Sequence, residues 1–330
     1  MRQRSTPLSA LLCLLGLLLA TAGAPSAASS ERFALHSDAW VNLHHFLYHM
    51  SRNALLDNKR RGSIVATREA DLALTPAPED LVVWQSAMQT YAKYGRRDLL
   101  MNADMRLIKD IIVGGNAEIP RGADAEPLYQ ALRNAMPVYR RVWWPEHDRL
   151  NQAAIESLRR QLTEHGEAMT EQMVARYNAA WPDQPVRVDL TPYADARGAY
   201  TTGEEPPYLS NHIVFSSDHP RYHGLPGFEM LFHEVGHGLP FSTQIEPASQ
   251  AAAKALSLAE SGVWHRYQFY ATGAAMRQVI GPDYQSYADR RQMWSNEEGQ
   301  ALRLAFEQAE PVAGNLTGYF KRVHQARPEP

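Results

Sequence analysis

Hydrophobic and polar residues alternate with two different periods along the chain. From about residue 31 to residue 180, apolar side chains recur every three or four positions, as in Phe33, Trp40 and Leu43. That spacing is typical of helices that bury one face against a core. The pattern therefore predicts that the N-terminal half is mostly helical.

Three short segments that follow Trp181-Pro182 are strand candidates, and the first two have the two-residue period of strands. They cover residues 186–190, 199–202 and 212–217. Apolar and polar residues that alternate over so few positions are typical of half-buried strands. These segments predict a small sheet.

Helical spacing returns at Pro226, which predicts a helix from there to about Gly238 and further helices after it. Pro240 should end or kink this helix just past His237, because proline lacks the N–H that a helical hydrogen bond needs. The predicted fold class is α+β and predominantly helical, with a small β-sheet that precedes the helix beginning at Pro226.

The pattern divides the chain into three regions. Residues 1–28 combine Arg2 and Arg4 with an apolar run and small residues, which predicts a signal peptide and therefore a secreted or periplasmic protein. No apolar stretch of about 18 residues follows, so we expect no membrane span after processing. Residues 29–180 form the helical N-terminal region, and residues 181–330 are expected to carry the chemistry.

Composition narrows the class of function. Hydrophobic residues make up 45% of the chain, charged residues 21%, and the net charge is −3. These values are typical of a globular protein without a basic surface for nucleic acid, so a small or peptidic partner is expected. The one cysteine, Cys13, lies in the predicted signal peptide, so any zinc site must use histidine and carboxylate ligands.

The motif His-Glu-Val-Gly-His at 233–237 is the strongest functional feature of the sequence. His233 and His237 lie four residues apart, so on a helix their rings project from one face and can bind one Zn²⁺ ion. Glu234 lies beside the first histidine, where a carboxylate can take a proton from a metal-activated water. The motif predicts a zinc-dependent hydrolase.

The third ligand decides the subclass. A metzincin would have Gly and His at the positions that Pro240 and Thr243 occupy, so that class is excluded. Glu260 lies 23 residues after His237, in a stretch expected to be helical over 251–270, which leaves room for a loop and an antiparallel return. We expect Glu260 to be the third ligand, the alternative being a solvated surface glutamate. The carboxylates downstream of the motif are Glu246, Glu260, Asp283, Glu297 and Glu298.

With Glu260 included, the motif resembles the gluzincin clan of zinc peptidases, which pair His-Glu-x-x-His with a glutamate on a following helix. The resemblance implies that His233, His237 and Glu260 bind zinc and that Glu234 is the catalytic base and acid. It further implies a zincin-like catalytic region within 181–330 and a peptide or protein substrate. The likeness covers about one fifth of the chain.

Several residues near the motif have open roles. Clan members commonly stabilise the oxyanion with a tyrosine or histidine from a later helix. His45 and His49 also have ligand spacing, but their apolar neighbours indicate a packed helix instead. Glu229 lies one turn before His233 and is a candidate to orient its ring. The candidate oxyanion donors are His265, Tyr267, Tyr270, Tyr284, Tyr287, Tyr319 and His324.

Two alternatives to a peptidase remain at this point. One is a zinc hydrolase that acts on another amide or ester. The other is an exported binding protein whose zinc site is structural or degenerate. A structural zinc site would be closed by four protein ligands, whereas a catalytic site keeps one position open.

Overall fold

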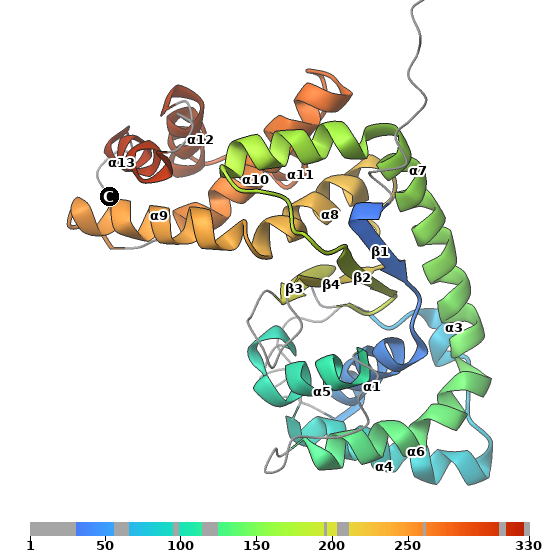
Figure 1. Ribbon diagram of the computed structural model, residues 1–330. Helices are drawn as coiled ribbons and strands as arrows, with labels where there is room; N and C mark the ends of the chain where they lie inside the picture. Colours follow the sequence, from blue (N-terminus) through green and yellow to red (C-terminus); the bar gives the residue numbers. More distant parts are fainter. Residues whose placement is uncertain are drawn as a thin grey trace, which may run out of the picture.

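The computed structural model describes residues 31–55, 66–94, 99–113, 125–194, 197–202, 211–259, 262–309 and 315–326. Within these residues the protein is predominantly helical with one small sheet, which confirms the predicted α+β class (Figure 1). The predicted signal peptide, residues 1–28, lies outside the described residues. Among the helices described, none is both long enough and apolar enough to span a bilayer.

Four strands form the sheet in the order β1-β2-β4-β3. β1, β2 and β4 run parallel, and β3 is antiparallel to β4. The three segments predicted as strands are confirmed as β2, β3 and β4. The strands are β1 (Phe33–His36), β2 (Val186–Thr191), β3 (Ala199–Thr202) and β4 (His212–Ser216).

The helical prediction was wrong for β1. Phe33 belongs to a strand that pairs in register with Val186, about 150 positions along the chain. Strand hydrogen bonds need a partner strand, and here that partner is remote in sequence. In so short a segment, the helical spacing of Phe33 with Trp40 could not reveal it.

Helices cover both faces of the sheet (Figure 1). Along β4, Ile213 and Phe215 face one apolar core, while Val214 faces the other. This two-residue alternation is how a strand contributes to two layers at once. The helices beside the second core are α1 (Ala39–Leu55), α4 (Pro78–Tyr94), α5 (Ala103–Val113) and α6 (Glu126–Val142).

The first core lies between the sheet and the helices of the C-terminal half. The long helix α7 (Trp144–Tyr177) joins the two sides, because it contacts α1 and α6 as well as β2, α8 and α10. The other helices on this side are α8 (Leu225–His237), α9 (Ser242–Ala255), α10 (Val263–Ile280), α11 (Tyr287–Arg290), α12 (Glu297–Ala309) and α13 (Leu316–Ala326). The short helix α3 (Glu69–Leu72) lies beside the N-terminal end of α7 (Figure 1).

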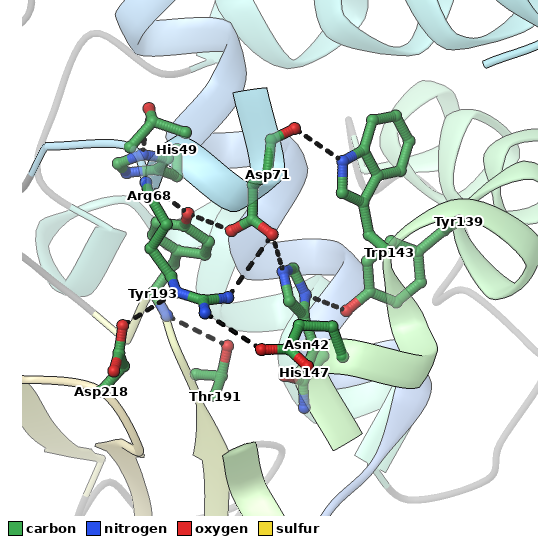
Figure 2. A network of polar contacts seen from close by, with 12 residues as sticks. Asn42, His49, Arg68, Asp71, Tyr139, Trp143, His147, Thr191, Tyr193 and Asp218 are labelled. Atoms are coloured by element: carbon green, nitrogen blue, oxygen red, sulfur yellow. Dashed lines mark hydrogen bonds and ion pairs between the residues drawn. The ribbon is translucent and has the colours of Figure 1, made fainter. Parts of the chain in front are cut away.

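A buried polar network fastens α3 to α7 and to the segment after β2 (Figure 2). The Asp71 carboxylate accepts a hydrogen bond of 2.5 Å from the Tyr193 hydroxyl and lies 3.2 Å from Nε2 of His147. Tyr139 contacts the other ring nitrogen of His147 at 2.8 Å. Burial opposes ionisation of Asp71, but His147, Tyr193 and Arg68 outweigh it and lower the pKa of Asp71. The network fixes Tyr193, which lies just after the end of β2.

Candidate metal centre

The helix that carries the motif is α8, Leu225–His237. It begins one residue before Pro226 and ends at His237, which confirms both predicted ends. Gly227 and Gly236 permit its close packing: a Cβ at Gly227 would lie 2.0 Å from the Tyr222 carbonyl oxygen, and one at Gly236 would lie 2.5 Å from the Tyr177 hydroxyl. The sequence therefore places the motif in a tightly enclosed helix.

His233 and His237 point at a common position. Their Nε2 atoms lie 3.3 Å apart. Two imidazole ligands of one tetrahedral Zn²⁺ ion, each at about 2.0–2.1 Å, are separated by about 3.3 Å. Burial lowers the pKa of His233 well below its usual value and that of His237 to about 3, so both rings are neutral at pH 7, as metal ligands must be.

The third member of the group is His265, in the first turn of α10. One ligand nitrogen from each of the three histidines lies within 4.8 Å of the other two. The His265 ring centroid is 5.0 Å from that of His237 and 5.6 Å from that of His233. Sequence reasoning had considered His265 only as an oxyanion donor. His265 lies 28 residues after His237, too far along the chain to form part of a short sequence motif.

Glu260, the predicted third ligand, lies outside the described residues, so its role stays a prediction. The continuous helix expected over 251–270 was wrong. α9 ends at Ala255, and α10 begins after Gly262. Ser257 and Gly262 have φ values of 56° and 69°, in the left-handed region that interrupts a right-handed helix.

Glu234 is buried beside the histidines. Its carboxylate accepts a hydrogen bond of 2.6 Å from the Thr201 hydroxyl, which also lies 2.8 Å from the Glu234 carbonyl oxygen. Burial raises the pKa of Glu234 to about 7, against the opposing effects of Thr201 and the charge of Arg197. A carboxyl with a pKa near neutrality can both accept and return a proton. Thr201 lies on β3 and gave no functional indication in the sequence.

Glu229 does not orient His233. Its carboxylate accepts hydrogen bonds from the Tyr284 hydroxyl at 2.9 Å and from the Tyr287 backbone N–H at 2.7 Å, and it pairs with Arg290 at 3.1 Å. These contacts attach α11 to the motif helix. Nδ1 of His233 has no hydrogen-bond partner among the described residues.

A cavity of about 340 Å³ opens onto the three histidines and Glu234. Of the candidate oxyanion donors, Tyr287 and His265 line this cavity and the others do not. The Tyr267 hydroxyl donates instead to the Arg176 carbonyl, and that of Tyr319 to the Phe306 carbonyl. The remaining wall residues are Leu100, Arg197, Ala199, Tyr200, Thr201, Tyr222, Met230 and Phe269.

The other histidine pair is structural, as its sequence context indicated. His45 contacts the Val41 carbonyl and the Tyr200 hydroxyl, while His49 contacts Thr67. The Asp71–His147 pair of Figure 2 is equally enclosed, since both side chains have no exposed surface. Substrate access therefore favours the centre on α8.

The donor set fits zinc. Three neutral imidazoles have ligand nitrogens within 4.8 Å of one another, with a carboxylate beside them and a cavity in front, and imidazole and carboxylate are donors that Zn²⁺ accepts. We searched the described residues for three or more His, Cys, Asp or Glu side chains close enough to hold one ion, and His233, His237 and His265 form the one such group. Comparison with protein-family models, curated proteins and solved structures finds no match to this chain.

Proposed function

We propose that this protein is a zinc-dependent hydrolase that cleaves peptide bonds. The observation that carries the proposal is the convergence of His233, His237 and His265 beside the buried Glu234 at the floor of a cavity. A structural zinc site would enclose the ion with a fourth protein ligand. The resemblance of the motif to gluzincin peptidases supports the choice of a peptide substrate over another amide or ester.

The three histidines would hold Zn²⁺, which supplies Lewis acidity and lowers the pKa of a bound water towards about 7. Glu234 accepts the proton of the attacking water and passes it to the leaving amine. Thr201 keeps the Glu234 carboxylate directed at the cavity through its hydrogen bond of 2.6 Å. The proton thus stays on one carboxyl group between attack and departure.

Tyr287 is the side chain best placed to stabilise the developing oxyanion. It lines the cavity, and its ring stacks on Phe269 at 5.9 Å between centroids, which sets its direction. Glu229, on the motif helix, accepts a hydrogen bond from the backbone N–H of Tyr287. A phenolic O–H held in this way can donate to charge that appears only in the transition state.

The test combines metal analysis with a peptide-library digest. Wild-type protein should contain about one zinc per chain and cleave a subset of peptides, whereas Glu234→Gln should keep the zinc and lose hydrolysis by at least about 100-fold. Glu171→Gln, an exposed residue on α7, is the control and should behave as wild type. A protein that folds fully but never binds zinc, or a Glu234→Gln variant that cleaves as well as wild type, would refute the proposal.

A further inference from the structure

Arg197 lies on the wall of the metal cavity, in the segment that leads into β3. It lines the same cavity as His233, Glu234 and His265. Among the described lining residues it is the one side chain with a permanent positive charge. A cation on a wall that is otherwise aromatic, apolar or metal-binding is a specific feature that hydrolysis of a peptide bond does not itself require.

The backbone at Arg197 is held in place from two sides. The Tyr222 hydroxyl donates to the Arg197 carbonyl at 2.8 Å, and the Ser216 N–H donates to the Gly198 carbonyl at 2.8 Å. Gly198 has a φ of 96°, and a Cβ there would lie 2.8 Å from the Tyr222 ring. These contacts set where the arginine side chain leaves the backbone.

The charge of Arg197 influences the pKa values of Glu234 and His265. It opposes the burial that raises the pKa of Glu234, and it adds to the burial that lowers the pKa of His265. Arg197 therefore contributes positive charge to the cavity from the protein itself.

The size and the walls of the cavity limit what this charge can bind. A volume of about 340 Å³ is near the lower end of the range for small-molecule sites and suits a few residues rather than a folded protein. Leu100, Met230 and Phe269 supply apolar surface for a side chain. The guanidinium group is the protein cation best matched to a carboxylate, since its fork can bind both oxygens.

We propose that Arg197 binds a carboxylate of the substrate, so that the centre acts on short peptides with a free carboxylate close to the cleaved bond. This inference rests on the proposed function and names its substrate class. The carboxylate is either the peptide's C-terminus or the side chain of an acidic residue. Both sources present the same chemistry to Arg197.

The experiment measures binding by calorimetry to the full chain carrying Glu234→Gln and loaded with zinc, so that no probe is consumed. The probes are N-acetyl-Phe-Leu as the free acid, N-acetyl-Phe-Leu amide, and N-acetyl-Phe-Glu amide. One or both carboxylate probes should bind roughly 10- to 100-fold more tightly than the neutral amide, as expected for a charge-assisted contact. Adding Arg197→Gln should remove the preference, and Arg197→Lys should keep part of it.

Arg221→Gln is the matched control, because it removes the same charge from an exposed arginine outside the cavity wall and should leave the preference intact. Equal binding of all three probes, absence of binding, or a preference that survives Arg197→Gln would overturn the inference. Hydrolysis by the protein with Glu234 intact is followed in parallel. Cleavage of the acid and the amide at equal rates would refute the role of Arg197 but support the proposed function. Preferred binding of carboxylate probes without any cleavage would support the role of Arg197 but refute the proposed function.

Discussion

Replacing His265 by alanine tests the metal centre more directly than any other change. The ligand nitrogens of His233 and His237 are already 3.3 Å apart, whereas the His265 nitrogen lies within 4.8 Å of both. To reach the separation of about 3.3 Å in a tetrahedral site, its distance to each of them must shorten by up to about 1.5 Å. His265 is exposed, so this shift requires no rearrangement of the core.

The magnitude follows from the share of one ligand in the binding free energy. Zinc sites with four protein ligands bind with about 10–16 kcal/mol, which is about 2.5–4 kcal/mol per ligand. His265→Ala should therefore weaken zinc binding by about 100- to 1000-fold. The fold should persist, because the side chain is exposed and its removal leaves no cavity in the core.

The assay is competition for zinc against a chromophoric chelator, with circular dichroism to confirm folding. Glu260→Ala is measured beside it, and His223→Ala serves as the control, an exposed histidine outside the group. If His265→Ala binds zinc as tightly as wild type while Glu260→Ala does not, the third ligand is Glu260 and the assignment of His265 is refuted. Loss in both variants would mean that both residues contact the ion, and four protein ligands would make the zinc site structural and contradict its catalytic role.

Three further predictions address the chemistry, the packing and the pH dependence. Tyr287→Phe should lower kcat by roughly 100-fold with unchanged zinc content and little change in KM; an unchanged kcat would exclude Tyr287 as the oxyanion donor. Gly227→Ala should reduce the free energy of unfolding by roughly 3 kcal/mol, because its Cβ meets the Tyr222 carbonyl at 2.0 Å. Gly262→Ala should cost only about 1 kcal/mol of φ strain, because Gly262 is left-handed (φ 69°, ψ 23°) and nothing lies within 4 Å of its Cβ position; similar denaturation midpoints for the two variants would contradict this. Burial raises the pKa of Glu229 from 4.5 to about 7, so its stabilising contribution is complete below about pH 4.5 and is lost as pH rises through 7. Tm should therefore fall between pH 4.5 and 7 in the wild type, and Glu229→Gln should reduce this fall. An equal fall of Tm in the variant would contradict the raised pKa of Glu229.

The amount that could be predicted depended on how local each feature is. The motif helix, both of its ends and the three later strands follow from spacings within about a dozen residues. Phe33 shows where this reasoning fails, since its strand exists only because Val186 is its neighbour in the sheet. The interruption of the expected helix at 251–270 depended on left-handed backbone at Ser257 and Gly262, which hydrophobic periodicity does not encode.

By itself the sequence determined that His233, Glu234 and His237 share one helical face, because residues four apart on a helix are neighbours whatever surrounds them. Only the tertiary structure decided that His265 completes the group, that Thr201 holds Glu234, and that Arg197 faces the same cavity. These residues come from separate parts of the chain and meet through packing of the sheet against α8 and of α8 against α10. Such contacts depend on the angles at which helices and strands cross, and a short sequence pattern does not determine these angles.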